Sequence, residues 1–477
     1  AVGQQSLSAA TTSSNNTAIG YKALFANTTG ADNVAVGAEA LEANTTADNN
    51  TAVGIKALTS NTTGTQNTAV GHDALADNTT ASNNTAVGFS ALGNNTTGQL
   101  NTAVGHRSMI TTTTGGFNTA FGAESLEANT EGVNNVAVGW RSQHNTTTGQ
   151  QNTSVGTSSL AQLTTANNNT AVGYLALTAN TSGVENAAVG SLALDANTTG
   201  QTNSAFGAFA LGANTTGDNN TAVGQGALVA NTTADNNTAC GYRTLVSNTT
   251  GSVNTAVGGL ALDANTTGVE QTAVGYNALS ASTTSTGNTA IGRSALANVT
   301  TGNNNAAIGH DAGVDITTGS NNFCAGVSAG SNITTGSNNV VLGNGASAPA
   351  NNSVNTITLG SSDINTLRCQ VQTISSLSDA RDKTNIVDIE DGLDLINLLK
   401  PRKFTWAMRE PSANDGTTHL GFIAQELDEV IGDKNEYMHL VDKINPNKLE
   451  ASYSRLIPIL TKAIQELSAE VNSLKAA

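Results

Sequence analysis

Two side chains in the C-terminal part of the chain could do chemistry together. Ser378 and Lys383 lie five residues apart in a polar stretch that also holds Asp379 and Arg381. A serine hydroxyl is a poor nucleophile until a base takes its proton, and a lysine can be that base when desolvation lowers its pKa toward neutrality. The pair could then cut the main chain beside Ser378. Taken alone, the same residues would form only a solvated polar turn.

Other arrangements of reactive residues give no comparable signal. His72, His106 and His310 share one position of the repeat described below, but they do not fall on adjacent copies, so we expect a solvated face and not a metal site. The glycine-rich segments lack the Gly-Lys-Ser/Thr that a phosphate-binding loop requires. We therefore expect no metal and no cofactor.

Composition sets this chain of 477 residues apart from an ordinary globular protein. Only 11% of its residues are charged and 4% are aromatic. A core of Ala and Val buries little area per residue, so further burial must come from stacking along the chain or from partner chains. The formal net charge of -16 disfavours nucleic acid as a partner. Cys240, Cys324 and Cys369 lack metal-ligand spacing and are expected to pack as small apolar residues.

A repeat of seventeen residues runs from the first residues to about 360. Its glycine recurs at every seventeenth position from Gly3 to Gly360, without an insertion or deletion. Disordered tracts do not resist slippage in this way, so the repeat predicts a solenoid in which each copy forms one coil. At about 4.8 Å per coil, the shaft would be a rod of roughly 100 Å. The first residues already lie in register, which suggests that an N-terminal attachment end precedes them.

Each repeat contains one short strand and one turn. Four residues before the glycine stands Asn, with Gln271 and Thr356 as departures, and stacked amides can form ladders along the axis. Thr-Ala-Val or Thr-Ala-Ile follows, and its two adjacent apolar residues must face opposite sides of a strand. One side closes the coil, and the other is expected to pack on a neighbouring chain.

A Leu four residues after the glycine, as at Leu58, is expected to fill the corner of the coil. The next stretch, such as 61–64, is read as a turn in which Asn61 and Gly64 tolerate positive φ. Near the end, Gly313, Gly330 and Ser347 replace the Leu. The repeat resembles the head repeats of YadA-like trimeric autotransporter adhesins, which implies a trimeric parallel β-roll; we leave its handedness open.

A different composition begins after about residue 370, and four ordered segments there resemble the peptidase S74 family. These intramolecular chaperones end phage tail fibres, tail spikes and endosialidases. The segments are LSDARDKTNI at 377–386, PRKFTW at 401–406, GFIAQEL at 421–427 and YSRLIPIL at 453–460.

The resemblance implies that Ser378 and Lys383 form a self-cleaving dyad. We favour a cut between Leu377 and Ser378 and keep the bond after Ser378 as the alternative. Motif residues expected to support the site are Asp379, Arg381, Asn385, Gln425 and Glu426.

The sequence thus predicts a mainly β protein with a solenoid shaft at 1–360, a neck at 361–377 and an α+β chaperone at 378–477. A helix from about 452 carries Leu456, Leu460, Ala463, Leu467, Val471 and Leu474 at three- and four-residue steps, as in a coiled coil.

We expect a homotrimeric, extracellular virion fibre that contacts a host glycan or protein receptor and joins other tail proteins through its N-terminal end. The only catalysis expected is one self-cleavage per chain. The alternatives are a bacterial trimeric adhesin, or a polysaccharide-degrading tail spike whose catalytic domain lies outside this chain.

Overall fold

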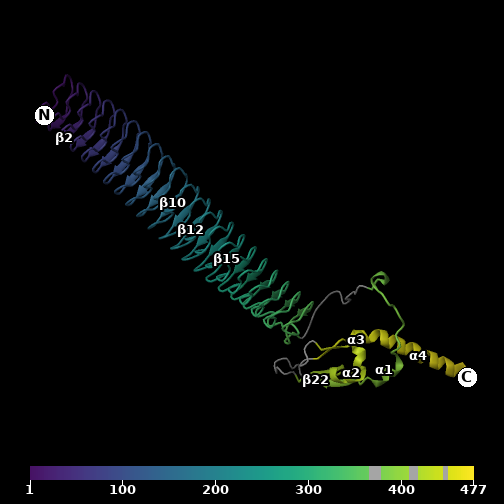
Figure 1. Cartoon of the computed structure of the whole chain (residues 1–477). Helices are drawn as coiled ribbons and strands as arrows, with labels where there is room; N and C mark the ends of the chain where they lie inside the picture. The colour runs from purple at the N-terminus through teal and green to yellow at the C-terminus, as the bar shows by residue number, and fades with distance from the viewer. Residues whose placement is uncertain (365–377, 408–416, 444–448, 477) are drawn as a thin grey trace. The chain divides into compact units, whose positions relative to one another are not determined.

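A computed structural model describes residues 1–364, 378–407, 417–443 and 449–476. The chain divides into two compact units, Ala1–Asn321 and Asn322–Ala477. Figure 1 shows the first unit as a stack of similar coils with one short strand each. The chain is mainly β: a parallel β-solenoid of about twenty turns, followed by a small region that contains helices.

Twenty-one strands of three residues mark the repeats, and all have the same place in their coil. They are β1 (Thr17–Ile19), β2 (Val34–Val36), β3 (Thr51–Val53), β4 (Thr68–Val70), β5 (Thr85–Val87), β6 (Thr102–Val104), β7 (Thr119–Phe121), β8 (Val136–Val138), β9 (Thr153–Val155), β10 (Thr170–Val172), β11 (Ala187–Val189), β12 (Ser204–Phe206), β13 (Thr221–Val223), β14 (Thr238–Cys240), β15 (Thr255–Val257), β16 (Thr272–Val274), β17 (Thr289–Ile291), β18 (Ala306–Ile308), β19 (Phe323–Ala325), β20 (Val340–Leu342) and β21 (Ile357–Leu359).

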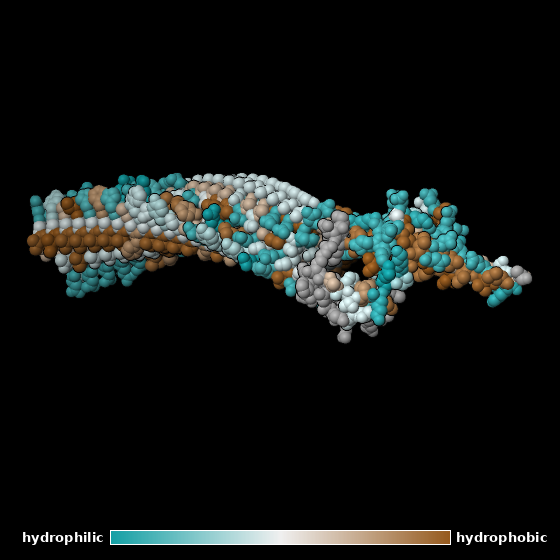
Figure 2. All heavy atoms as spheres, turned by 90° about the horizontal axis from the view of Figure 1, so that it is seen from below, coloured by the Kyte–Doolittle hydropathy of each residue, from teal (hydrophilic) through white to brown (hydrophobic). Residues whose placement is uncertain are grey.

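Neighbouring coils pair in parallel with a constant offset of seventeen residues, as predicted. Ala171 pairs with Ala188, and Val172 with Val189. The middle residue, usually Ala, is buried in β1 to β20, whereas the last residue faces outward and is partly or largely exposed. Because side chains alternate along a strand, this is the two-sided arrangement that the sequence indicates. Figure 2 shows an apolar row along the solenoid surface.

The solenoid interior is filled by small and medium apolar side chains. The Leu four residues after each glycine is fully buried, as at Leu58, which confirms its expected place in the corner. Its backbone has φ near +52°. Positive φ also occurs at Lys56 and Gln66, but not at Asn61 or Gly64, so that part of the turn prediction was wrong. Leucine rarely adopts this left-handed conformation, so we infer that the packing of its buried side chain in the corner stabilises it.

Asparagine side chains form two buried ladders through the solenoid. In the predicted ladder, Asn50 donates its backbone N–H and its Nδ2 to Oδ1 of Asn33, at 2.9 and 3.2 Å. The second ladder runs through Asn61, which donates Nδ2 to Oδ1 of Asn44 at 3.0 Å and to the carbonyl of Gly64 at 2.9 Å. Asn61 is therefore a core residue and not a solvated turn residue.

In the later coils, different residue types occupy two of the core positions. Gly313 and Gly330 stand in the Leu position with positive φ. Ile316 and Ile333, three residues later, are fully buried where other coils have the second-ladder Asn. At Gly330, Cys324 Sγ and Ile333 Cδ1 occupy the space of the missing Leu, since a Cβ would lie 2.5 and 3.5 Å from them.

Two cysteines lie within the described strands. Cys324 is buried in the middle of β19, and this burial raises the pKa of its thiol to about 11. Cys240 ends β14 and is exposed. Cys369 lies outside the described residues.

The C-terminal region alternates short helices and two small antiparallel ladders. Its elements are the 3₁₀ turn η1 (Ala380–Asp382), α1 (Leu393–Leu398), β22 (Arg402–Thr405), β23 (Thr418–Gly421), α2 (Ala424–Ile431), η3 (Gly432–Lys434), α3 (Asn435–Met438), β24 (Val441–Asp442), β25 (Glu450–Ala451), η4 (Tyr453–Arg455) and α4 (Leu456–Ala476). β22 pairs with β23, and β24 with β25. No helix among the described residues has the length and apolar character needed to cross a membrane.

Helix α4 begins where the sequence predicts a helix, but the predicted apolar stripe divides between two faces. Leu456 and Ala463 are buried with Ile459, and Leu456 and Ile459 pack in one core with Leu395 and Leu427. The other stripe residues are exposed in the single chain: Leu460, Leu467, Val471 and Leu474. One face of α4 therefore completes the core, and the other face has no cover from the described residues.

Candidate functional site

The structure brings the two predicted dyad residues into contact. Lys383 Nζ lies 2.7 Å from Ser378 Oγ, and it donates a hydrogen bond to that oxygen. Turn η1 separates them and reverses the chain enough for the two side chains to meet. Both residues are exposed. Leu377, on the other side of the favoured cut, lies outside the described residues.

Asp379 and Arg381 hold the turn between the dyad residues. The Asp379 carboxylate caps η1 by accepting a hydrogen bond from the Arg381 backbone N–H at 2.9 Å. The Arg381 guanidinium also pairs with it, Nη2 to Oδ2, at 2.6 Å. This guanidinium, with the backbone N–H, holds the pKa of the Asp379 carboxyl below its usual value. The two residues therefore shape the turn, while Asn385 follows it with φ of +53°.

Two of the quoted motifs are joined by an ion pair. Arg402 on β22 donates through Nε at 2.9 Å and through Nη2 at 2.5 Å to the two oxygens of Glu426 on α2. This guanidinium lowers the pKa of the Glu426 carboxyl. Gln425, its neighbour, is exposed. Glu426 thus ties α2 to the β22–β23 ladder and does not reach the dyad through any described contact.

A tyrosine joins the motif at 453–460 to the motif at 421–427. The Tyr453 hydroxyl donates to the carbonyl of Phe422 at 3.0 Å and accepts from its backbone N–H at 3.1 Å. The two rings also meet edge to face, with centroids 5.6 Å apart. These motif residues therefore contact one another and stabilise the fold, and no described contact joins them to the dyad.

Two further anchors were missed by sequence reasoning. Asp391 accepts hydrogen bonds from Lys434 and from the Tyr437 hydroxyl, and the bond to this carboxylate raises the pKa of Tyr437 to about 12. Glu466 on α4 accepts the backbone N–H of Leu393 at 2.7 Å. Their partners are between 43 and 73 residues away in sequence, so no local pattern announces them.

The histidine column of the solenoid has an aromatic residue within it. The ring of Phe89 lies between the rings of His72 and His106, stacked on each with centroids 5.5 Å apart. His310 lies 3.1 Å from the Asp311 carboxylate. These three histidines are therefore separated from one another, as the sequence indicates.

Two comparisons with known proteins give a match, and the first falls in the C-terminal region. Residues 378–435 match the family model of peptidase S74, described as the chaperone of endosialidase. The chain is also similar to an uncharacterized protein VP1 of Micromonas pusilla reovirus, with 48% identity over 60 residues, which are 12% of this chain and 3% of that protein. A solenoid shaft with such a domain fits a phage tail fibre or spike-type protein. The match to the chaperone of endosialidase model thus covers the segment that contains Ser378, Lys383 and Glu426.

Proposed function

We propose that this chain is part of a homotrimeric virion fibre whose solenoid contacts the host surface and whose C-terminal domain assembles three chains and then cuts itself free. The observation that carries the self-cleavage is the 2.7 Å contact between Lys383 Nζ and Ser378 Oγ. The expected partners are two further copies, a host glycan or protein receptor, and other tail proteins.

The cut would proceed through an ester. Once Lys383 is a neutral amine, it takes the Ser378 hydroxyl proton as Oγ bonds to the Leu377 carbonyl carbon. The Leu377–Ser378 C–N bond breaks, and the lysine ammonium returns the proton to the leaving nitrogen. A water molecule then hydrolyses the ester, leaving a carboxylate on Leu377 and the free hydroxyl on Ser378.

Cleavage would depend on assembly. Both dyad side chains are exposed in the single chain, and in the contact as it stands the lysine is the donor. Removing a lysine from water favours its neutral form. A neighbouring chain that covers the pair would therefore switch the dyad on after the chains have come together.

Self-association is supported by the uncovered face of α4. Ile457, Leu460, Ile464, Leu467, Val471 and Leu474 follow one another at steps of three and four, and each is between 39% and 78% exposed. These positions would form the a and d seam of a coiled coil between copies of the chain. In a parallel pair, Glu470 at g faces Lys475 at e of the next chain, so the charges favour parallel copies.

Residue types in this seam also provide an argument against a third chain. Ile and Val occupy the a positions and Leu the d positions, a choice typical of two-stranded coils. The exposed last residues of the solenoid strands, such as Val155 and Phe206, offer each copy a second contact surface. The number of chains is therefore a direct test of the proposal.

The experiment compares wild type, Ser378→Ala and Lys383→Met, with Ser376→Ala as a nearby serine control. Denatured mass reports cleavage, and native mass counts chains. We expect wild type and the control to release the fragment 378–477, both dyad variants to remain whole, and every native complex to hold three chains before release.

Each part of the proposal can fail separately. Equal cleavage in Ser378→Ala would exclude Ser378 as the nucleophile. Intact trimers in every variant would leave an assembly domain without self-cleavage. A native mass of one or two chains would overturn the trimeric fibre. A fibre without the chaperone fragment that does not adsorb to host cells would overturn the attachment role.

A further inference from the structure

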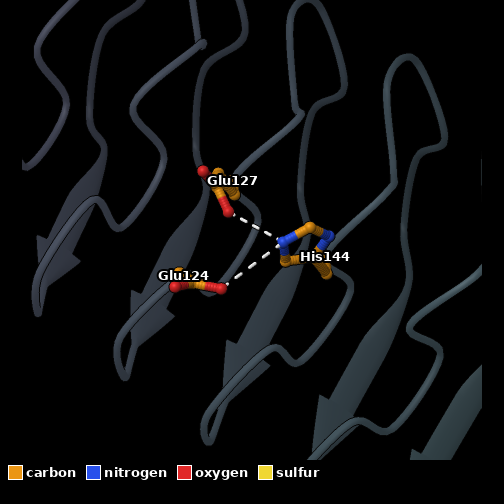
Figure 3. A group of neighbouring side chains, drawn as sticks. All are labelled: Glu124, Glu127 and His144. Carbon is orange, nitrogen blue, oxygen red and sulfur yellow. Dashed lines mark ion pairs between the residues drawn. The ribbon is translucent and has the colours of Figure 1, made fainter.

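A group of potential metal ligands lies on the solenoid surface, far in sequence from the dyad. Glu124 and Glu127 lie in the coil that follows β7, and His144 lies in the next coil, after β8. Figure 3 shows the three side chains turned toward one another. One ligand atom from each lies within 4.8 Å of the others. Their side chains are between 13% and 26% exposed.

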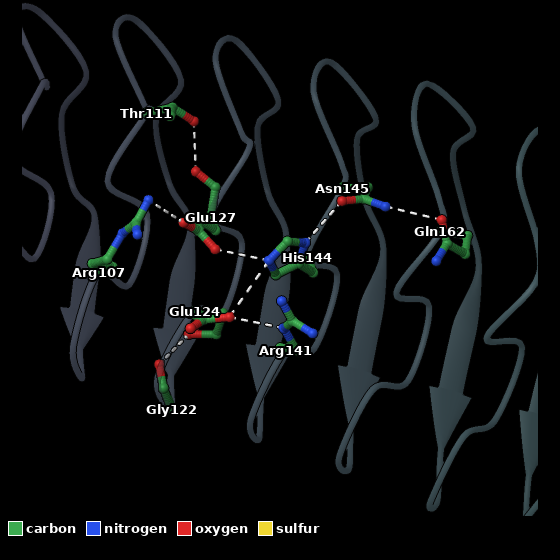
Figure 4. Close-up of polar contacts among 10 residues, drawn as sticks. Arg107, Thr111, Gly122, Glu124, Glu127, Arg141, His144, Asn145 and Gln162 are labelled. Atoms are coloured by element: carbon green, nitrogen blue, oxygen red, sulfur yellow. Dashed lines mark hydrogen bonds and ion pairs between the residues drawn. The ribbon is translucent and has the colours of Figure 1, made fainter.

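The imidazole of His144 is held by its other nitrogen. Nδ1 lies 2.8 Å from Oδ1 of Asn145, while Nδ2 of Asn145 donates to Oε1 of Gln162 at 2.9 Å. Figure 4 shows this chain of polar contacts across successive coils. An amide oxygen can only accept, so Nδ1 carries the ring proton. In the neutral ring, Nε2 therefore presents its lone pair.

That lone pair faces negative charge. Nε2 lies 2.7 Å from Oε2 of Glu127 and 3.6 Å from Oε2 of Glu124. It is shielded from solvent, and no hydrogen bond of acceptable geometry reaches it from the described residues. A lone pair directed at two carboxylates is repulsive unless a cation lies between them. The cation is either a proton on Nε2 or a metal ion.

Two arginines fix the carboxylates from outside. Arg107 Nη2 lies 2.7 Å from Oε1 of Glu127, which leaves Oε2 of that carboxylate toward His144. Arg141 Nε lies 2.8 Å from Oε2 of Glu124. Each carboxylate oxygen has more than one acceptor site. The arginines thus orient the two carboxylates without using all their lone pairs.

The ligand spacing is close to what a tetrahedral ion needs. With metal–ligand bonds of about 2.0–2.1 Å, neighbouring ligand atoms in a tetrahedron are about 3.3 Å apart. The separations of 2.7 and 3.6 Å lie on either side of this value. Imidazole nitrogen with carboxylate oxygen is a ligand set that zinc accepts, and a histidine ligand usually donates its other N–H to an outer acceptor, as here to Asn145.

We propose that His144, Glu127 and Glu124 bind a divalent transition-metal ion of the zinc type, with water completing the coordination. The ion links consecutive coils of the solenoid through side chains. No other described group of at least three His, Cys, Asp or Glu side chains meets the same spacing. The proposed site therefore cross-links two coils at one place in the solenoid and does not recur with the repeat.

The test titrates the intact chain with Zn²⁺ by calorimetry and with Co²⁺ by its visible absorption, at neutral pH. Variants are His144→Ala and Glu127→Gln, with His106→Ala as a surface histidine control. We expect one ion per chain in wild type and control. Both ligand variants should lose that binding, and Asn145→Ala should weaken it by about tenfold because the imidazole is no longer oriented.

Two results would overturn the proposal. Absence of Zn²⁺ and Co²⁺ binding in wild type would mean that a proton on Nε2 holds the three residues together. Binding that is equal in wild type and His144→Ala would place the ion elsewhere. Because the side chains are at the surface, unchanged circular dichroism in each variant separates loss of the site from loss of the fold.

Discussion

The solenoid and the C-terminal domain are stabilised in different ways by the same chain. In the solenoid, contacts form within one coil or join it to the next coil, as between Asn50 and Asn33, and most buried polar groups are amides and backbone groups. In the C-terminal domain, the ties are individual and span up to 73 residues, as between Leu393 and Glu466. A solenoid gains stability coil by coil, whereas a compact domain unfolds as a unit. A destabilising substitution should therefore affect only nearby coils in the solenoid, but the whole unit in the C-terminal domain.

The largest expected effect comes from the repeat glycine, because coils touch there through backbone. Gly258 has φ of +128°, and a Cβ would lie 2.6 Å from the Gly275 carbonyl. Gly258→Ala should destabilise its coil by at least about 3 kcal/mol, through backbone strain and overlap with main-chain atoms. Hydrogen exchange should show faster opening around β15 and β16, with β3 unchanged.

Gly259→Ala is the matched control. At this neighbouring position the nearest atom to a new Cβ is a Tyr276 ring carbon at 3.7 Å, an ordinary contact. The control should change stability by no more than about 0.5 kcal/mol. Equal effects of the two substitutions would show that coil contact does not select glycine at 258.

The next largest effect tests the amide ladder. Asn203 donates to Asn186 Oδ1 at 3.2 Å and to the Gly217 carbonyl at 2.8 Å, and its own Oδ1 accepts the backbone N–H of Asn220 at 3.0 Å. Asn203→Ala leaves buried groups without partners, so we expect about 2–4 kcal/mol of local destabilisation.

Hydrogen exchange of the amides near β12 and β13 measures that loss. The exposed neighbour Gln201 serves as the control, because its side chain lies outside the core. A uniform rise in exchange over the whole solenoid, and not near Asn203 alone, would contradict additive coils.

The repeat made most of the solenoid predictable. Its constant period predicted the coil, and the adjacent Ala and Val predicted an inner and an outer face, because alternation follows from strand geometry. The second ladder was missed because Asn61 beside Thr and Gly is also typical of a turn. The positive φ of Leu58 could not be predicted from residue type, since packing and not propensity imposes it.

The sites were predictable to different degrees. Ser378 and Lys383 are near in sequence, so their meeting required only a short turn, and the motif indicated it. The group at His144 was missed because its members occupy different repeat positions in two coils. Only the closed coil shows that these positions lie side by side. Whether the dyad cuts stays a prediction.

A smaller effect is expected in the C-terminal domain, where one tie should affect the whole unit. Tyr453→Phe removes both hydrogen bonds to Phe422. The tyrosine is 45% exposed, so water can replace part of the loss, and we expect about 1 kcal/mol. Thermal unfolding followed by fluorescence should shift for the entire domain. Tyr174→Phe, an exposed ring in the solenoid, should have no such effect; protection lost at Phe422 alone would argue against a cooperative domain.

The smallest effect separates the two regions by pH. Arg402 lowers the pKa of Glu426 below 4.5, and the Leu393 N–H lowers that of Glu466. A lowered folded pKa gives stability that is present above the unfolded value and is lost as pH falls through the folded value. In the solenoid, burial raises the pKa of Asp195 and Asp263 above 3.8. Their contribution has the opposite sign, since it is present at low pH and lost as pH rises through the folded value.

Acidification from pH 7 to below about 4 should therefore lower the stability of the C-terminal domain. Over the same range, protonation of Asp195 and Asp263 should raise the stability of the solenoid. Hydrogen exchange can follow both regions in one sample. Glu426→Gln should reduce the acid sensitivity of the domain, and Asp263→Asn should remove part of the solenoid gain. Glu124 should offset part of this gain in solenoid stability. Arg141 lowers the pKa of Glu124, so its contribution to stability is lost as pH falls. If both regions lost protection in parallel with pH, the carboxyl contacts would not account for their difference.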